Sequence, residues 1–427
     1  MTAKRLTVWL GAQPVGELSQ DEHGDLAFVY GTPWLANPSS EAISVSLPKR
    51  PEPFTHRECL PFFDGLLPEG GQRSAVAKAL GVSEKNPYAL LNELGGDVAG
   101  ALQFLPPGVK PKPAKGPWTP HPLDDEALVA VLDRLPLRPM LAGEDGLRLS
   151  LAGAQAKLPV CVLDEHICLP QSGQPTTHIL KPAIPDLKAS VENEAFAMRL
   201  AAEVGILAAH VEPRIVQASR GRKRTFLLVT RYDRTSAKGL VTRIHQEDFC
   251  QAMGIPSALK YQSEGGPNLA RCFGLVQSVS TLPAVDRMRL LDVVLFNLML
   301  GNADAHGKNF SILYSEGGPR LAPFYDLMST EFYPDLSKKS AMKIGEQSRF
   351  ERLGPKAWGE FSKQISVTLP FIRQRVLKLA DQIPDAAKAV LEGLKQPGLD
   401  AKALRQLADL VEDRAERCAK TVAGTTP

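Results

Sequence analysis

Hydrophobic residues alternate with polar ones at the start of the chain and follow helical spacing towards its end. Leu6, Val8 and Leu10 occupy every second position, so the segment RLTVWLGAQPVGELS predicts a β-hairpin with Gly11 near its turn. The stretch from Phe62 to Gly96 predicts short helices that are interrupted by Pro and Gly. Residues 1–105 are therefore expected to form an N-terminal α/β subdomain.

A proline-rich segment follows this subdomain. Seven prolines lie between Pro106 and Pro122. Because proline donates no backbone hydrogen bond, the segment is not expected to form regular core structure. We interpret residues 106–125 as an exposed linker.

The next part of the chain predicts a small sheet. The segment LRLSLAGAQAKLPVCVL predicts a strand, a turn of small residues and a second strand, and THILKPA predicts another strand that ends at Lys181. SVENEAFAMRLAAEVG predicts a helix closed by Gly205, and RTFLLVTRY predicts a further strand. Residues 126–245 are expected to form a β-rich lobe.

Helical spacing dominates after Glu247, with amphipathic helices near 370–382 and 399–420. Residues 246–427 are expected to form a larger helical lobe. The predicted fold class is α+β, with a small β-rich lobe, a larger all-α lobe and the N-terminal α/β subdomain.

The densest group of reactive side chains follows the most apolar helix. GNADAHGKNFSILY comes directly after LLDVVLFNLML and carries Asp304 and Asn309. FSILY predicts a strand, SEGGPR a turn, and LAPFYD a return strand that ends at Asp326. Phosphoryl transfer uses such a set: one acid orients or deprotonates the attacking hydroxyl, while an amide oxygen and a second acid hold Mg²⁺.

Two simpler interpretations compete with this one. Asp304 and Asn309 could merely cap turns, but their order together with Asp326 favours chemistry. GNADAHGKN also resembles a nucleotide-binding P-loop. It has one residue too many between its glycines, Asn309 stands where Ser or Thr is required, and it follows a helix rather than a strand. We therefore reject the P-loop.

The upstream lobe offers candidate nucleotide-binding groups. SLAGAQAK lies between two predicted strands, where a kinase phosphate loop is expected, although a plain tight turn around Gly153 remains the alternative. Lys181 ends a strand, as does the kinase lysine that contacts the α- and β-phosphates. Glu192 or Glu194 on the next helix could pair with it.

Composition excludes several other classes. The 427 residues carry 50 basic and 47 acidic side chains, a net charge of +3, which gives no argument for direct binding to nucleic acid or membranes. SRGRKRTF at 219–226 is better explained as a solvated hairpin tip than as a DNA contact. No apolar run is long enough to span a bilayer. The six cysteines form no CxxC pair, which argues against zinc and suits a reducing cytoplasm.

Seven stretches together resemble the HipA family of serine/threonine kinase toxins from bacterial HipBA toxin–antitoxin systems. They run from residue 62 to 330, and they are FFDGLLPEG, LSLAGAQAKLPV, THILKP, VENEAF, HQEDFCQAMG, GNADAHGKNFSILY and LAPFYDLMST. The resemblance implies a kinase-like bilobal fold that uses ATP and Mg²⁺.

The resemblance also implies residue roles. Asp304 matches the catalytic base, Asn309 and Asp326 match the magnesium ligands, and Lys181 matches the ATP lysine. Ser150 matches a serine that such kinases autophosphorylate, which expels the phosphate loop beside it. The remaining expected contacts are the phosphate loop within Leu151–Lys157 (Ala152, Gly153, Ala154, Gln155 and Lys157) and the adenine-binding hinge (Thr230, Arg231 and Tyr232).

The chain departs from ordinary protein kinases in two motifs. YDLMST replaces Asp-Phe-Gly, and DAHGKN places His after Asp, an order seen in lipid kinases. We assign His306 a supporting catalytic role and Lys308 a contact to the γ-phosphate.

The implied partners are a HipB-like helix-turn-helix antitoxin, operator DNA reached mainly through that antitoxin, and a protein substrate. The family's best-known target is an aminoacyl-tRNA synthetase, glutamyl-tRNA synthetase, whose phosphorylation leads to growth arrest and persistence. Two alternatives stay open: a small-molecule or lipid kinase of the same fold, and a catalytically silent co-repressor acting with the antitoxin.

Overall fold

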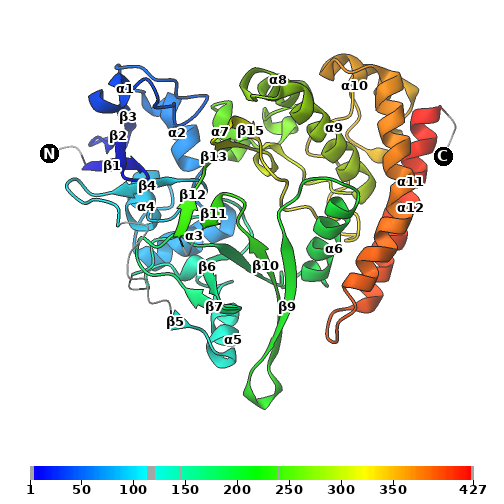
Figure 1. Ribbon diagram of the computed structural model, residues 1–427, viewed down its shortest axis with the longest axis horizontal. Coiled ribbons are helices and arrows are strands. Elements are labelled where there is room, and N and C mark those ends of the chain that lie inside the picture. Colours follow the sequence, from blue (N-terminus) through cyan, green and yellow to red (C-terminus); the bar gives the residue numbers. More distant parts are fainter. Residues whose placement is uncertain (1–3, 113–120, 145, 238–239, 425–427) are drawn as a thin grey trace. The chain divides into compact units, whose positions relative to one another are not determined.

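The computed structural model describes residues 4–112, 121–144, 146–237 and 240–424. The chain forms two compact units, and neither is continuous in sequence (Figure 1). The first unit contains Met1–Pro182, Arg214–Ala258 and Leu313–Ser315. The second contains Ala183–Pro213, Leu259–Ile312 and Glu316–Pro427.

The first unit opens with a four-stranded sheet of order β3-β2-β1-β4, formed by β1 (Lys4–Leu10), β2 (Gln13–Gln20), β3 (Leu26–Tyr30) and β4 (Leu102–Leu105). The predicted hairpin is confirmed, with Gly11 in the turn at a φ of +58°. A core rich in phenylalanine, including Phe28, Phe63 and Phe104, packs beside the sheet. The helices of this part are α1 (Thr32–Ala36), α2 (His56–Asp64), α3 (Gly70–Leu80) and α4 (Pro87–Leu94).

A six-stranded sheet of order β5-β7-β6-β8-β10-β9 forms the rest of the first unit's framework. Its strands are β5 (His121–Pro122), β6 (Leu158–Leu163), β7 (His166–Leu169), β8 (His178–Pro182), β9 (Val211–Gln217) and β10 (Lys223–Thr230). A second core cluster, which includes Leu128, Val160 and Leu228, joins this sheet to α5 (Asp125–Arg134). The unit also contains β11 (Arg234–Ala237), β12 (Leu240–Arg243), β13 (His245–Asp248) and α7 (Phe249–Ala252).

The proline-rich segment is exposed from residue 106 to 112 except at Pro111, which is partly buried, and residues 113–120 of the predicted linker lie outside the described part of the chain. Its last residues are structured, contrary to the prediction. His121 and Pro122 form β5, which lies at the edge of the sheet. A proline is tolerated in an edge strand because its missing N–H is not needed to pair with a second neighbour. The Asp124 side chain then accepts from the backbone N–H of Ala127 and caps α5.

The strand predicted before the phosphate loop is reduced to one bridge. Leu149 pairs with Asp97 in parallel, and its neighbours form no ladder. Among the described residues, only the segment around Asp97 pairs with this backbone: the Ser150 N–H donates to the Asp97 carbonyl at 3.0 Å.

The second unit is mainly helical. Its helices are α6 (Ser190–Glu203), α8 (Leu269–Val279), α9 (Pro283–Leu300), α10 (Pro355–Ile365), α11 (Leu369–Gly393) and α12 (Ala401–Ala423). The amphipathic helices predicted near the C-terminus are confirmed, and the first of them is longer than predicted. In Figure 1 α11 and α12 run side by side, and α12 buries the apolar face that contains Leu404, Leu407 and Val411.

The return strand of the predicted hairpin is wrong in position. β14 (Ser311–Ser315) forms as predicted, but β15 covers Gly318–Leu321 and ends before the LAPFYD segment is complete. The edge position of β15 in its sheet accommodates Pro319, which the sequence pattern assigned to the turn. Residues 322–326 are consequently irregular, and they carry Asp326.

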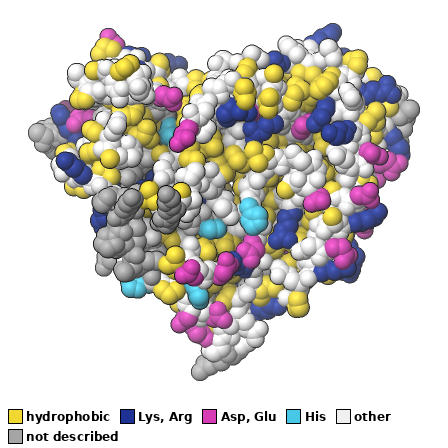
Figure 2. All heavy atoms as spheres, in the orientation of Figure 1, with side chains coloured by type: hydrophobic (Ala, Val, Ile, Leu, Met, Phe, Trp, Pro, Cys, Tyr) yellow, Lys and Arg dark blue, Asp and Glu magenta, His cyan; other side chains and the backbone are white. Residues whose placement is uncertain are grey.

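On the face in Figure 2, acidic and basic side chains are interspersed. In the 219–226 turn, Arg222 pairs with Glu126 at 2.6 Å and Arg224 pairs with Asp133 at 2.6 Å, so α5 neutralises both cations. Among the described residues, no helix combines the length and apolarity that crossing a bilayer requires.

Candidate active site

The catalytic loop begins where the buried helix α9 ends. Gly301 caps α9 with a φ of +71°, and its N–H donates to the Asn297 carbonyl. A Cβ at this position would lie 2.6 Å from the Cβ of Glu331 and 3.0 Å from Nε of Arg414, so the close packing requires glycine. The loop therefore leaves a rigid element in a fixed direction, as a site that must hold reacting groups requires.

Buried polar side chains hold the start of the loop. The Asn302 amide donates to Oδ1 of Asn297 at 2.9 Å, and its own Oδ1 accepts from the Asp304 N–H at 3.1 Å. The Thr330 hydroxyl donates to the Gly301 carbonyl at 3.1 Å and accepts from the Ala303 N–H. These contacts set the backbone on which Asp304 stands.

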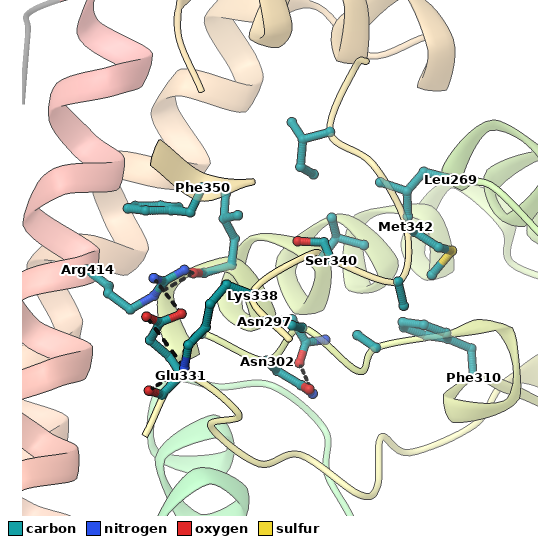
Figure 3. A pocket seen from close by; sticks show the side chains of 17 residues that line it. Leu269, Asn297, Asn302, Phe310, Glu331, Lys338, Ser340, Met342, Phe350 and Arg414 are labelled. Carbon is teal, nitrogen blue, oxygen red and sulfur yellow. Dashed lines mark hydrogen bonds and ion pairs between the residues drawn. The ribbon is translucent and has the colours of Figure 1, made fainter. Parts of the chain in front are cut away.

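A cavity of about 40 Å³, enough for a few water molecules, lies behind this part of the loop (Figure 3). Arg414 of α12 forms one end, where its guanidinium donates twice to the Leu298 carbonyl at 2.9 and 3.3 Å. It also lies 3.6 Å from Glu331 and 4.1 Å from the Phe350 ring centroid. Arg414 thereby satisfies a carbonyl in the last turn of α9 and stabilises the end of the helix that carries the loop.

Asp304 is exposed at the tip of the loop, and one of its oxygens has a fixed partner. The Tyr261 hydroxyl donates to Oδ1 of Asp304 at 2.7 Å, and the Tyr261 ring packs edge-on against His306 at 5.2 Å. His306 and Lys308 are buried, with 6% and 7% of their surface exposed. Sequence reasoning placed Asp304, His306 and Lys308 in one site, and the second unit brings them together in one loop.

Asn309 and Asp326 meet although 17 positions separate them in the chain. Nδ2 of Asn309 donates to Oδ2 of Asp326 at 3.4 Å, while Oδ1 of Asn309 accepts from the His306 N–H at 3.1 Å. Asp326 has a φ of +59°, a conformation that non-glycine residues adopt at a cost and that is concentrated at functional sites. The two side chains are thus in direct contact, with the amide nitrogen of Asn309 on the side of Asp326.

This pair fits Mg²⁺ as a ligand set. One carboxylate and one amide supply hard oxygens, and magnesium in phosphoryl-transfer sites takes few protein ligands because phosphates and water complete its shell. Within the described ranges no cluster of three or more His, Cys, Asp or Glu side chains has a metal-binding arrangement. A closed cage of the structural zinc type is therefore absent from that part of the chain.

A buried asparagine of α6 holds the segment after Asp326. The Asn193 side chain donates to the Ser329 carbonyl at 2.9 Å and accepts from the Ser329 N–H at 2.8 Å. Asn193 is fully buried. Sequence reasoning missed this contact, because a single asparagine within a predicted helix resembles any other surface residue.

The two candidate glutamates of α6 differ in their surroundings. Glu192 accepts from the Asp400 N–H at 3.0 Å and so supports the start of α12. Glu194 is buried, with 2% of its surface exposed. Glu192 is buried as well, with 6% of its surface exposed, so burial does not distinguish the two candidates.

The first unit holds the other predicted site residues. Lys181 lies in β8 opposite Leu227 of β10 and is 6% exposed. Burial of a lysine in a strand is unusual unless its ammonium group has a partner or a ligand. Its position in a central strand of the six-stranded sheet gives it a rigid base.

The predicted phosphate loop is anchored by the N-terminal subdomain. The Ser150 hydroxyl donates to the Leu66 carbonyl at 2.8 Å, and the side chain is completely buried. Pro68 pairs with Gly153 in a parallel bridge, and the Glu69 N–H donates to the Gly153 carbonyl at 3.1 Å. Within the loop, Lys157 Nζ donates to the Ala152 carbonyl at 2.8 Å, while Ala154 is exposed and Gln155 is partly exposed.

The predicted hinge follows β10, and its arginine side chain is committed elsewhere. Thr230 ends β10, and the Tyr232 hydroxyl hydrogen-bonds to Gln246. The Arg231 guanidinium is buried between two carboxylates, with a 2.7 Å contact to Asp233 and a 3.3 Å contact to Asp97. Any contact of Arg231 with a nucleotide would therefore involve its backbone rather than its side chain.

Asp97 is the centre of this buried network. Its carboxylate accepts from Arg231, Arg234 and Arg243 and from the Thr176 hydroxyl. Burial alone would raise the pKa of Asp97, but the arginines outweigh it and hold the pKa below the usual range. The network joins the N-terminal subdomain to the strands that carry the hinge.

Comparisons with known proteins agree with these observations. The HipA N-terminal domain model matches residues 6–105, and the HipA-like C-terminal domain model matches residues 149–391. A putative kinase of Sinorhizobium fredii, Y4mE, is 52% identical over 97% of this chain and 99% of its own length. The serine/threonine-protein kinase toxin HipA of Shewanella oneidensis is 30% identical over 98% of this chain and 96% of its own length.

A solved structure of Shewanella oneidensis HipA, in a complex with HipB and operator DNA, superimposes with a TM-score of 0.85. It is 28% identical in sequence and covers 99% of each chain. The α+β prediction is thus confirmed: the fold is the mixed α/β, kinase-like fold of HipA. Matching domain models over both parts of the sequence, together with full-length similarity, establish that this chain belongs to the HipA family.

Proposed function

We propose that the chain is an ATP- and Mg²⁺-dependent protein serine/threonine kinase and the toxin of a toxin–antitoxin module. The observation that carries the proposal is the 3.4 Å contact of Asn309 with Asp326, on the same loop framework that presents Asp304. A base, an amide ligand and a carboxylate ligand in this arrangement are the groups that phosphoryl transfer requires.

In the proposed reaction the oxygen of an acceptor serine or threonine attacks the γ-phosphorus of ATP. The bond from that phosphorus to the bridging oxygen breaks, ADP leaves, and the acceptor's proton passes to Asp304. Mg²⁺ held by Asn309 and Asp326 would neutralise the phosphate charge. Lys308 would contact the γ-phosphate, and His306 would support the loop.

The first unit supplies the nucleotide-binding groups in this proposal. Lys181 contacts the α- and β-phosphates. The phosphate loop Leu151–Lys157 covers the phosphates, and the backbone of Thr230–Tyr232 binds adenine. The burial of Lys181 and the commitment of the Arg231 side chain to Asp97 and Asp233 support these assignments.

Autophosphorylation of Ser150 would inactivate the enzyme. The Ser150 hydroxyl is buried and bonded to the Leu66 carbonyl, so a phosphoryl group has no room there. A phosphoserine carries close to two negative charges, and burying it unpaired is strongly unfavourable. Phosphorylation would therefore require the loop to leave its position and would prevent its return.

The proposed partner is a HipB-like antitoxin, because the superimposed relative was solved with HipB and operator DNA. Contact with DNA would be made mainly through the antitoxin, since two arginines of the 219–226 turn, Arg222 and Arg224, already pair with Glu126 and Asp133. The proposed target class is an aminoacyl-tRNA synthetase, and its phosphorylation would arrest growth and favour persistence.

The test is a transfer assay with γ-labelled ATP, Mg²⁺ and bacterial lysate, followed by mass spectrometry of the labelled proteins. The wild-type chain should label a protein serine or threonine, and the Asp304→Asn variant should not. Label found only on a small molecule or lipid would contradict the protein kinase assignment. Binding of ATP without any transfer would contradict catalysis altogether.

A further inference from the structure

Tyr261 contacts the proposed base, and it lies outside the seven stretches that carry the resemblance to the HipA family. Its hydroxyl lies 2.7 Å from Oδ1 of Asp304. An ionised carboxylate only accepts hydrogen bonds, so the tyrosine is the donor. A donor that meets a charged acceptor at this distance makes a strong hydrogen bond.

The backbone around Tyr261 is fixed to the catalytic loop. On one side, the Lys260 carbonyl accepts from the Gly307 N–H at 3.3 Å. On the other side, the Gln262 N–H donates to the Ala341 carbonyl at 3.1 Å. Tyr261 therefore stands between two anchored neighbours.

The same frame extends to the residue before Asp304. The Ala341 N–H donates to the Ala303 carbonyl at 2.8 Å, and the Gln262 side chain accepts from the Lys343 N–H at 2.8 Å. Three segments of the second unit thus fix the position of the phenol relative to the loop. The ring is held as well, because it packs edge-on against the buried His306 at 5.2 Å.

Asp304 itself is exposed, and packing does not select its rotamer. The contact with Tyr261 turns Oδ1 towards the phenol and leaves Oδ2 as the oxygen that an acceptor hydroxyl can approach. An acceptor bound at Oδ2 also lies beside the phenol. Tyr261 therefore influences both the orientation of the Asp304 carboxylate and the space available to the acceptor.

We propose that Tyr261 is a positioning residue that orients Asp304 towards the acceptor hydroxyl and forms one wall of the acceptor site. The proposal rests on the proposed kinase function. Tyr261→Phe removes only the hydroxyl and should lower kcat about tenfold to a hundredfold, as expected for loss of a charge-assisted hydrogen bond that directs a base. KM for ATP should not change, because the contact is to the acceptor side.

The test is a double-mutant cycle in the labelled-ATP assay. It compares the rates of wild type, Tyr261→Phe, Asp304→Ala and the double variant, with incubations long enough to measure the residual rate that remains without the Asp304 carboxylate. If Tyr261 acts through Asp304, adding Tyr261→Phe to Asp304→Ala should cause no further loss. A residue with a merely structural role would cause the same loss in both backgrounds, and that result would overturn the proposal, as would full activity of Tyr261→Phe.

Tyr325→Phe is the matched control. The Tyr325 hydroxyl donates to the Lys308 carbonyl at 2.7 Å and bonds Ser311, so it supports the same loop without touching Asp304. Its effect should be equal in both Asp304 backgrounds. A second measurement uses the ¹³C chemical shift of the Asp304 carboxyl, which should move in Tyr261→Phe and stay in place in Tyr325→Phe.

The outcomes separate the two proposals. Absence of phosphoryl transfer by the wild-type chain would reject the kinase function, and an unmoved carboxyl shift would reject the Tyr261 contact independently of activity. Transfer by the wild type with additive losses would reject only the role of Tyr261.

Discussion

Nδ2 of Asn309 donates a hydrogen bond to Oδ2 of Asp326 at 3.4 Å. The two residues lie on opposite sides of the hairpin that the sequence predicts between them. Asp326 adopts a left-handed backbone conformation at this point, with a φ of +59°. Three residues further along, the Asn193 side chain holds the backbone of Ser329 through two hydrogen bonds. The fold therefore maintains the contact at some local cost, and such strain is concentrated at functional sites.

Removing the Asp326 carboxylate should change how phosphoryl transfer depends on the Mg²⁺ concentration. We expect Asp326→Asn to lower phosphoryl transfer about a hundredfold or more and to raise the Mg²⁺ concentration at half-maximal rate, because one charged ligand is lost. Asp335→Asn, at an exposed position in the following segment, is the control. A Mg²⁺ titration that gives the same curve for Asp326→Asn and wild type would remove Asp326 from the metal site.

A charge at Ser150 should expel the phosphate loop. Ser150→Asp places a carboxylate where the buried hydroxyl donates to the Leu66 carbonyl, and burying that charge is costly. We expect affinity for a fluorescent ATP analogue to fall at least about tenfold, while Ser150→Ala keeps most of it, since the lost hydrogen bond is worth about 1 kcal/mol. Ser83→Asp is an exposed control. Unchanged nucleotide affinity in Ser150→Asp would contradict the loop's role.

Glu247 should make stability depend on pH. Burial raises its pKa to about 7, although Ser44, Tyr314 and the Val45 N–H all donate to it. Between the ordinary pKa of 4.5 and about 7, the native state keeps a proton that the unfolded state releases. The free energy of unfolding should therefore fall by about 3 kcal/mol as pH rises through this window, and it should be independent of this group above it.

Glu247→Gln isolates that contribution. The amide oxygen can keep two of the donors, and the Ser44 hydroxyl can turn to accept from the amide N–H₂. Burial lowers the pKa of neighbouring His245 to about 4, which makes stability rise with pH up to about 6.5 and partly masks Glu247 in the wild type. Urea unfolding from pH 4.5 to 8 should show this rise more clearly in Glu247→Gln. Parallel curves for the two proteins would contradict the assignment.

The Asp97 network should be essential to the first unit. Asp97→Asn leaves Arg231, Arg234 and Arg243 without their shared carboxylate in a buried site. Breaking a buried ion pair from one side costs about 3–5 kcal/mol, so the urea midpoint should fall strongly. Asp186→Asn, at an exposed site, should change it little. Equal midpoints would show that the cluster contributes no net stability.

Sequence periodicity predicted several elements correctly, whereas the roles of the reactive residues in the catalytic loop were inferred from a motif and stay a prediction. The alternation of Leu6, Val8 and Leu10 placed the first strand correctly, and the run before Gly301 placed α9. The position of β15 was missed because Gly318 and Pro319 are turn residues by local preference. A proline is tolerated in an edge strand, and only the tertiary structure shows that β15 lies at the edge of its sheet.

The residues that hold the site were beyond reach of sequence reasoning. Asn193 and Tyr261 are isolated polar residues whose partners lie 136 and 43 positions away. The burial of Ser150 against Leu66 was equally invisible, since 84 positions separate them. Positioning depends on long-range contacts, whereas motif residues are recognised from their neighbours in the chain.

The most direct test of the account is the mass of the purified chain after incubation with ATP and Mg²⁺. We expect wild type to gain one phosphoryl group that maps to Ser150, and Asp304→Asn to gain none. A wild-type chain that binds ATP through Lys181 and yet carries no phosphate on any residue would contradict the claim that this site transfers phosphate to a protein hydroxyl.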